Sequence, residues 1–372
     1  MPILVLVWVG VYFALMLALL LGMWRLPHSR ALRDDECPTL SVLVTARNEA
    51  ADLPACLASL EALDYPVGRL QLVLVDDRST DETPRLLHAF ADAHPHATVV
   101  HTADLPANAL EAKARGLAAG FRVATGAWVL ITDADATVPR GWARHMLSLA
   151  GPGVGMVGGG LVVEPRGLVG VLERISWAFT QLFSVGAAGL GAPIICIGPN
   201  MGIRRDVYVS AGGLERAEFR IAEDLALFRM TLAAGLRART AVDAETTVRL
   251  TPVPNLRALI SQQRRWLGGG VEQGWAYRAG LSLAFGWGCG VAAFLLLGWM
   301  RWPAAWSAVW AARVAVDALA LDAQRRRMQL AAWLRYLPAL ELYTVFIFLI
   351  LPFTFLARRG VTWRGEGYVV RY

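Results

Sequence analysis

Two carboxylates separated by a single residue end an apolar stretch near the middle of the chain. Residues 129–132 read Val-Leu-Ile-Thr, which is typical of a buried strand, and Asp133 and Asp135 follow with only Ala134 between them. Carboxylates gathered where a strand ends indicate a site that holds positive charge. A D-x-D pair also occurs often by chance, so the other motifs of the chain decide whether this pair indicates a functional site.

Other polar motifs occur in an order that is hard to attribute to accident. They combine carboxylates, basic side chains and closely spaced glycines, which are the residue types that bind phosphates and metals. In chain order these motifs are TARNEA (45–50), VDDRSTDE (75–82), EAKARGLAAG (111–120), GPNMGIRRD (198–206), IAEDLAL (221–227) and QQRRW (262–266).

The stretches between these motifs predict the elements that position them. From residue 40 to about 251, short β-rich runs alternate with Ala- and Leu-rich stretches of helical period. Such alternation predicts an α/β fold with a mostly parallel sheet flanked by helices, in which ligands bind at the carboxyl ends of the strands. We expect strands at 40–45, 71–76, 97–101 and 127–132, and helices at 50–63, 80–93, 109–124 and 139–150.

Composition separates this chain from ordinary soluble enzymes. Of its 372 residues, 56% are hydrophobic and 18% are charged, which indicates a membrane protein. Residues 3–23 carry no charge and reach the length of about 20 residues that crosses a bilayer. A signal peptide would have basic residues before the apolar run and a small-residue cleavage site after it, whereas here Arg25, Arg30 and Arg33 follow. We therefore expect a transmembrane anchor at 1–24 and a cytoplasmic location for the chain that follows.

The cysteines and the net charge indicate the compartment and the partners. The four cysteines form no C-x-x-C pair or metal-ligand spacing, which suits a reducing compartment. Much of the formal charge of +6 lies beside apolar segments, as at 262–266, 322–329 and 357–360. We therefore expect contact with anionic lipid head groups and no binding of nucleic acid. The cysteines are Cys37, Cys56, Cys196 and Cys289.

An uncharged stretch at 175–198 is long enough to cross a membrane. A single crossing there would put the D-x-D pair and the later AED motif on opposite sides, so we reject it. Glycines and Pro193 interrupt the stretch, which favours an apolar helix followed by a core strand. This helix either belongs to the core or faces the bilayer and receives a lipid substrate.

The chain is expected to become interfacial and then membranous beyond residue 252. Residues 253–280 mix basic, tryptophan and apolar positions, as a helix at a head-group boundary does. Residues 281–357 form the expected C-terminal transmembrane region, and a basic and aromatic tail follows at 358–372.

Within that region, the number of membrane crossings stays open. Residues 281–300 and 337–357 are predicted spans, and 303–321 is a weaker candidate in which Arg313 and Asp317 can pair on one helical face. The sequence allows two or three crossings, and the distribution of basic residues does not decide on which side the tail lies.

The ordered motifs resemble the inverting family-2 glycosyltransferases of the GT-A fold, over nearly the whole chain from Ser41 onward. The resemblance implies that residues 38–252 form a cytoplasmic GT-A catalytic domain. It also implies that the first acidic loop binds the nucleotide of the sugar donor, with Asp77 at the base and Arg47 and Glu49 beside it.

The same resemblance assigns roles to two later motifs. Asp224 of AED stands where the family has its catalytic base, and the family's Q-x-x-R-W corresponds to Gln262, Arg265 and Trp266. A helix start can hold a carboxylate firmly near the acceptor hydroxyl, whose proton it must remove. Glu223 is expected to point elsewhere, because adjacent residues of a helix diverge by about 100°.

A divalent cation is expected beside the D-x-D pair. A nucleotide diphosphate gains negative charge as it leaves, and a cation that bridges it to carboxylates lowers the barrier. Hard oxygen ligands favour Mg²⁺ or Mn²⁺, with Asp135 as the ligand and Asp133 nearer the ribose or the metal. Lys113, Arg264 and Arg265 are candidates to stabilise the diphosphate, although Lys113 also fits a solvated surface charge.

The tail indicates a lipid acceptor. Its W-R-G-x-x-Y, at 363–368, is similar to that of ceramide-glucosyltransferase-like and carotenoid (chlorobactene-type) glucosyltransferases. Glu366 stands where a basic residue is expected, so a phosphate-binding role of the tail does not follow.

These features predict a multi-pass enzyme of the cell (inner) membrane. It would move a hexose from a nucleotide-diphosphate sugar, for which the resemblance implies UDP-glucose, to a hydroxyl of a membrane lipid such as a carotenoid, hopanoid or ceramide-like lipid. A processive polysaccharide synthase is the alternative, which the short chain and the few predicted spans disfavour. A non-catalytic sugar-nucleotide-binding membrane scaffold should have lost an acidic position, and none is lost. Nothing in the sequence indicates an oligomeric state.

Overall fold

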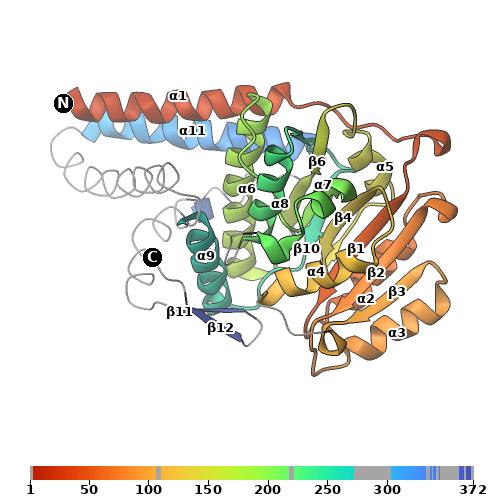
Figure 1. Ribbon diagram of the computed structural model, residues 1–372. Coiled ribbons are helices and arrows are strands. Elements are labelled where there is room, and N and C mark those ends of the chain that lie inside the picture. The colour runs from red at the N-terminus through yellow and green to blue at the C-terminus, as the bar shows by residue number, and fades with distance from the viewer. Residues whose placement is uncertain are drawn as a thin grey trace. The chain divides into compact units, whose positions relative to one another are not determined.

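The computed structural model describes residues 3–105, 110–217, 222–271 and 303–331, together with short pieces between 336 and 369. The described chain forms two compact units (Figure 1). The first, which we name the sheet unit, comprises Leu26–Glu164 and Gly191–Thr251. The second, the helical unit, comprises the described parts of Met1–Arg25, Pro165–Leu190 and Pro252–Tyr372.

A seven-stranded sheet forms the centre of the sheet unit (Figure 1). Only β8 runs antiparallel to its neighbours β4 and β6, and the other neighbouring pairs are parallel. The predicted α/β fold with a mostly parallel sheet is therefore confirmed. In spatial order the strands are β3 (Ala97–His101), β2 (Leu70–Asp76), β1 (Leu40–Ala46), β4 (Trp128–Asp133), β8 (Asn200–Arg204), β6 (Val154–Gly158) and β9 (Arg237–Thr240).

The four predicted strands are confirmed within one residue at each end, but each predicted helix begins three residues later than expected. The observed helices are α2 (Leu53–Glu61), α3 (Thr83–Ala93), α4 (Ala112–Val123) and α5 (Trp142–Leu147). Pro54 and Pro84 lie in the first turns of α2 and α3, where a residue without an N–H group costs no helical hydrogen bond. The residues before each helix instead form the loops that follow the strands.

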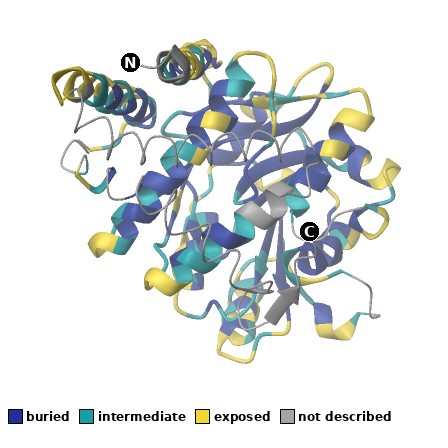
Figure 2. Ribbon diagram, turned by 90° about the vertical axis from the view of Figure 1, so that its left-hand side faces the viewer, coloured by how far each residue is buried: buried dark blue, intermediate teal, exposed yellow. Residues whose placement is uncertain are grey.

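The centre of the sheet is buried on both faces (Figure 2). Side chains alternate between the two faces along a strand, and nearly all side chains of β1, β2, β4, β6 and β8 are buried. On one face, Leu43, Val75 and Ile131 pack with α4 and with the later helices α7 (Arg205–Ser210) and α8 (Glu223–Ala233). Trp142 of α5 is fully buried, and its Nε1 donates a hydrogen bond to Asn200 Oδ1 at 2.9 Å. Burial of each large apolar side chain contributes about 1.5–3 kcal/mol, so this core holds the strand ends rigidly.

Smaller elements complete the sheet unit. A second sheet has the order β5 (Ala136–Thr137), β10 (Thr247–Leu250) and β7 (Gly160–Val163). Because β5 follows Asp135 directly, this sheet fixes the chain just beyond the D-x-D pair. Single 3-10 turns occur at Asp34–Glu36, Val67–Arg69, Thr102–Asp104 and Leu214–Arg216.

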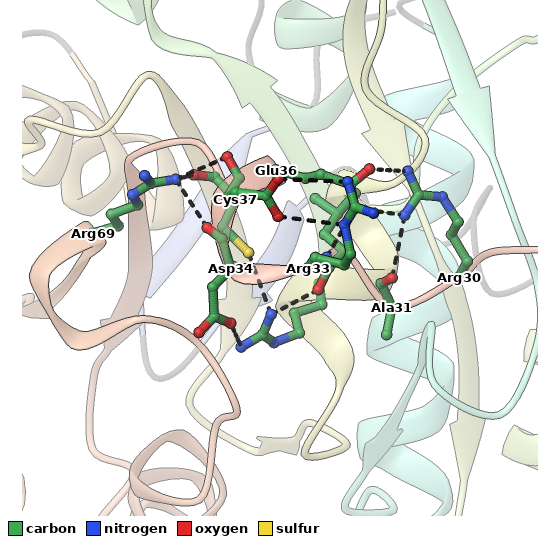
Figure 3. Close-up of polar contacts among 10 residues, drawn as sticks. Arg30, Ala31, Arg33, Asp34, Glu36, Cys37 and Arg69 are labelled. Carbon is green, nitrogen blue, oxygen red and sulfur yellow. Dashed lines mark hydrogen bonds and ion pairs between the residues drawn. The ribbon is translucent and has the colours of Figure 1, made fainter.

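The segment before β1 is held by polar contacts (Figure 3). The Arg30 guanidinium donates to both Glu36 carboxylate oxygens at 2.8 Å, and the Arg33 N–H donates to Glu36 Oε2 at 2.9 Å. Arg69 Nη1 donates to the Asp34 carbonyl at 3.0 Å. Two of the arginines that the sequence offers as topology signals therefore also shape this segment.

The helical unit is built from α1 (Ile3–Arg25), α6 (Gly167–Gly189), α9 (Leu256–Val271) and α11 (Pro303–Arg327). Helix α1 packs against α6 and α11, and α6 packs against α9 as well (Figure 1). A hairpin of β11 (Gly360–Trp363) and β12 (Glu366–Val369) lies near the C-terminus. Residues 175–189 of the uncharged stretch lie in α6, as the predicted apolar helix. The core strand expected within the rest of the stretch is absent there: residues 190–198 form neither helix nor strand, and β8 begins just beyond them at Asn200.

Within the described residues, one helix is long and apolar enough to cross a membrane, namely Pro303–Arg327. This helix contains the candidate at 303–321 that the sequence ranked lower, and α1 supplies a shorter apolar helix at Val9–Arg25. The predicted pairing of Arg313 with Asp317 is confirmed at 3.3 Å. The predicted spans at 281–300 and 337–357 lie wholly or mostly outside the described residues.

Candidate active site

The loops that follow β1 and β2 hold each other in place at the carboxyl ends of these strands. The Asn48 N–H donates to Ser79 Oγ at 3.1 Å, and Asn48 Oδ1 accepts from the Thr80 N–H at 2.8 Å. Asn48 has a φ of 53°, in the left-handed region that asparagine tolerates well. The neighbouring side chains of Arg47 and Glu49 are consequently carried by a fixed loop, and Glu49 is buried.

Asp77, predicted to contact the nucleotide base, is buried and already accepts several hydrogen bonds. Arg115 of α4 donates to it through Nε (2.7 Å to Oδ1) and Nη2 (2.9 Å to Oδ2). Thr102 Oγ1 donates to Oδ1 at 2.6 Å. An ionised carboxylate offers about four acceptor positions, so about one is left for a further donor. Asp77 chiefly joins its loop to α4 and can add a single bond to a ligand.

The D-x-D pair lies where β4 ends, as predicted, and both side chains are partly exposed. The Asp135 carbonyl accepts a hydrogen bond from the Thr251 N–H at 3.0 Å, which fixes the backbone of the pair. Burial, followed by the charges of Asp135, Asp133 and Glu49, raises the pKa of the Cys56 thiol. These three carboxylates therefore form one acidic region around a buried residue of α2.

Lys113 lies among carboxylates. Its Nζ forms an ion pair with Asp133 and lies 3.7 Å from Glu223 Oε1. Burial alone would lower the pKa of Lys113, but the charges of Asp133 and Glu223 outweigh it and raise this pKa, so the ammonium stays charged. The preceding residue, Ala112, has a φ of 50°, which costs a non-glycine residue about 1–2 kcal/mol. A solvated surface position for Lys113 is excluded.

Glu223 and Asp224 open α8, as predicted. Asp224 accepts the Leu225 N–H at Oδ1 (2.8 Å) and the Gly198 N–H at Oδ2 (3.3 Å). Burial raises the pKa of both carboxyls, that of Glu223 to about 7, with Asp224 adding to this rise and Lys113 opposing it. The expectation that Glu223 points elsewhere was wrong, because its longer side chain reaches toward Lys113.

Gly198 brings the backbone against these charges. A β-carbon at this position would lie 3.3 Å from Asp224 Oδ2 and 3.6 Å from Lys113 Nζ. Because residue 198 has no side chain, the side chains of Asp224 and Lys113 can both approach its backbone closely. We name Lys113, Asp133, Glu223 and Asp224 the charged cluster.

The acidic side chains fit an open metal site. Among the residues that the structure describes, no group of three or more His, Cys, Asp or Glu side chains has the arrangement of a metal site. Mg²⁺ and related ions, however, are usually held by one or two carboxylates and complete their coordination with water and substrate phosphates. Asp133 and Asp135 fit that incomplete donor set.

The Q-x-x-R-W motif lies on α9 of the helical unit and contacts α6. Gln262 Nε2 donates to Glu173 Oε1 at 2.9 Å, and Trp266 lies edge-on against Trp177 with ring centroids 4.1 Å apart. Burial raises the pKa of Glu173. The structure thus shows Gln262 and Trp266 contacting protein side chains.

The predicted site residues fall into two groups, and the roles assigned to them stay predictions. The sheet unit holds Arg47, Glu49, Asp77, Lys113, Asp133, Asp135 and Asp224, whereas the helical unit holds Gln262, Arg264, Arg265 and Trp266.

Three residues that contact the predicted site residues were not singled out from the sequence. Arg115 stands two positions after Lys113, and Gly198 precedes the strand β8. Glu173 is the only carboxylate of α6, and a single carboxylate in an otherwise apolar helical stretch is a usable signal of a buried polar partner.

This chain is similar in sequence to known proteins. The model of glycosyl transferase family 21 matches residues 6–372. Probable glycosyltransferase YdaM of Bacillus subtilis is 30% identical over 200 residues, which are 52% of this chain and 46% of that protein. Beta-monoglucosyldiacylglycerol synthase of a Synechocystis species is 34% identical over 110 residues, 30% of this chain and 22% of that protein. The chain thus spans less than half the length of these curated relatives.

A solved structure shares the fold. Mannosyltransferase PcManGT from Pyrobaculum calidifontis, in complex with GDP-Man and Mn²⁺, superposes with a TM-score of 0.57 at 24% identity. The alignment covers 92% of this chain and 99% of that one, which confirms a GT-A-like fold. The motifs resemble family 2, and the matching model is that of family 21. Because this match extends over nearly the whole sequence, the chain belongs to glycosyl transferase family 21.

Proposed function

We propose that this glycosyltransferase inverts the anomeric centre as it moves one hexose, from UDP-glucose, to a hydroxyl group of a membrane lipid. The charged cluster is the observation that carries the proposal. It places a buried ammonium and three carboxylates beside the carboxyl ends of the strands, where ligands of α/β sheets bind. The glucolipid synthase among the similar proteins supports glucose and lipid as substrates.

We assign the removal of the acceptor proton to Asp224. Two backbone N–H groups fix its carboxylate, and burial moves its pKa upward, toward the range in which a general base works best. The acceptor oxygen attacks the anomeric carbon from the face opposite the diphosphate as Asp224 takes up its proton. Glu223 contacts Lys113 and is assigned an electrostatic role.

Asp135 and Asp133 would hold Mg²⁺ or Mn²⁺ together with donor phosphates. The bound ion would supply charge neutralisation for the leaving diphosphate. Lys113 pairs with Asp133, so we assign it to orienting the D-x-D pair instead of binding the diphosphate itself. Arg264 and Arg265 remain the proposed diphosphate ligands on the strength of the motif.

The loops that follow β1 and β2, which are hydrogen-bonded to each other, supply the proposed nucleotide site. Arg47 and Glu49 would line it, and Asp77 would add the single bond that its remaining acceptor position allows. A nucleotide contact of this kind positions the donor without taking part in bond breaking.

The lipid acceptor requires a membrane location, which α1 and α11 support. Large apolar side chains of α1, such as Val11, Leu17 and Trp24, are exposed, and α11 has the length and composition of a span. We propose an inner-membrane protein whose sheet unit is cytoplasmic.

The test measures transfer and donor binding separately. Full-length protein in detergent micelles would receive radiolabelled UDP-glucose and a bacterial lipid extract, and mass spectrometry would identify lipids that gain a hexose. Asp224→Asn should lower transfer by about 100-fold or more and leave nucleotide-sugar affinity nearly unchanged, because a lost base affects only the chemical step.

Glu223→Gln serves as the neighbouring control and should reduce transfer less. Near-normal transfer in Asp224→Asn would remove the proposed base. A polymeric product would favour the polysaccharide synthase, and donor binding without any transfer would favour the non-catalytic scaffold.

A further inference from the structure

The buried carboxylate of α6 contacts the segment just before the helix that carries Q-x-x-R-W and the middle of that helix. Glu173 is 1% exposed, and its two carboxylate oxygens have different partners. Oε2 accepts the Val253 N–H at 2.7 Å, and Oε1 accepts Gln262 Nε2 at 2.9 Å. A buried carboxylate is costly unless it is hydrogen-bonded, so this pair of donors explains how the side chain is tolerated.

The next turn of α6 continues the contact. Ser176 and Trp177 follow Glu173 by three and four residues, and so lie on the same face of the helix. Ser176 Oγ accepts Gln263 Nε2 at 2.6 Å, and the Trp177 ring meets the Trp266 ring edge-on. Polar and aromatic contacts together therefore define the rotation of α9 about its own axis.

The other end of α6 approaches α1 closely. A β-carbon on Gly22 would lie 2.0 Å from the Gly186 carbonyl oxygen, and one on Gly189 would lie 1.8 Å from the Gly22 carbonyl oxygen. The two backbones touch only because these positions are glycines. Helix α6 thus links the proposed membrane anchor to the motif-bearing helix.

We propose that Glu173 is a positioning residue for sugar transfer, which holds α9 in the rotation that directs the remaining Q-x-x-R-W side chains to the donor. The role rests on the proposed function, because donor binding by that motif is itself a proposal. Glu173 touches no reacting atom and acts through Gln262. Loss of the hydrogen bond between Glu173 and Gln262 should therefore weaken binding of the nucleotide sugar more than it slows the chemical step.

The experiment compares Glu173→Gln, Gln262→Ala and the double variant in donor kinetics. Glu173→Gln keeps the side-chain volume but removes the charge that Gln262 binds, and its KM for the nucleotide sugar should rise about 10-fold with kcat changed less. In the Gln262→Ala background the same substitution should change KM by less than about 2-fold, because the side chain through which Glu173 acts has already been removed.

Two further variants separate positioning from general loss of structure. Glu164→Gln makes the same substitution at a carboxylate that pairs with Arg249 at the surface, and its kinetics should match the wild type. In Glu173→Gln/Gln262→Glu the hydrogen bond can form again with donor and acceptor exchanged, so part of the lost affinity should return. If Glu173→Gln fails to fold, Ser176→Ala removes the adjacent contact to Gln263 and should raise the same KM.

The outcomes are distinguishable. A wild-type protein that neither binds a nucleotide sugar nor transfers from it would refute the proposed function. Wild-type transfer with an unchanged donor KM in Glu173→Gln would refute only the positioning role, as would additive effects in the double variant.

Discussion

Replacement of Glu223 by glutamine should remove a pH dependence of stability that the wild type shows. Burial raises the pKa of Glu223, and the Asp224 charge adds to the rise, whereas the Lys113 charge lowers it. The net result is a pKa that rises from 4.5 to about 7 in the folded protein. Between these two values the folded protein binds a proton that the unfolded chain has released. The free energy of unfolding must therefore fall as the pH rises through this window.

The size of the effect follows from the shift. At about 1.36 kcal/mol per pKa unit, the change from 4.5 to about 7 corresponds to an upper limit on the order of 3 kcal/mol. For a domain of this size, 1 kcal/mol moves the midpoint of thermal unfolding by roughly 2–4 °C. The midpoint of Glu223→Gln, relative to the wild type, should consequently be higher at pH 8 than at pH 5 by up to about 6–12 °C.

The assay is thermal unfolding followed by tryptophan fluorescence in detergent micelles, at several pH values from 5 to 8. Taking the difference between variant and wild type cancels the titrating groups that do not interact with Glu223. Asp224 does interact with it, so the difference reports the titration of Glu223 together with the change that its loss causes in Asp224. Glu82→Gln is the control, since the Glu82 side chain is 68% exposed and pairs with Arg85 in a surface salt bridge. Parallel curves for the wild type and Glu223→Gln would refute the reasoning.

Three further predictions concern the partners of the site. Arg115→Lys should lower the stability of the protein by about 1.5–3 kcal/mol, measured as a loss of thermal midpoint, because lysine cannot reproduce the two bonds to Asp77; an unchanged midpoint would contradict this. Gly198→Ala should slow transfer by up to about 10-fold with little effect on donor affinity, since the new methyl group displaces Asp224; full activity would show that the spacing is not needed. Asp135→Ala should abolish transfer, and in the wild type a chelator should do the same, because the carboxylate is the proposed metal ligand; wild-type turnover in excess chelator would remove that assignment.

The strand framework could be predicted because it depends on local pattern. Buried parallel strands appear as short apolar runs, and their spacing with helical stretches gives the sheet directly. The same pattern places Asp133 and Asp135 at a strand end and Asp224 at a helix start, as the structure shows. Helix starts were less predictable, because the residues before Leu53 and Thr83 also fit a helical period but bond across to the neighbouring loop.

The partners of the charged groups could not be predicted in this way. Asp77 and Arg115 are 38 residues apart, and Glu173 and Gln262 are 89 apart, so only tertiary packing brings each pair together. Lys113 shows the consequence. From its position on a helix alone it fits either a solvated residue or a phosphate ligand, whereas the fold surrounds it with carboxylates from two other elements.

The charge of the cluster sets a requirement for donor binding. Lys113 carries one positive charge among the carboxyl groups of Asp133, Glu223 and Asp224, of which Glu223, with a pKa of about 7, is only partly ionised at neutral pH. Asp135 lies beside them, so the acidic groups outnumber the single ammonium. A nucleotide diphosphate is itself an anion, and in a partly buried site like charges repel more strongly than in water. A buried ion pair adds little stability by itself, because desolvation offsets the attraction, so Lys113 is better explained by what it positions. The donor should therefore enter this region only together with a divalent cation, and the proposed role of Lys113 is to keep Asp133 oriented for that ion.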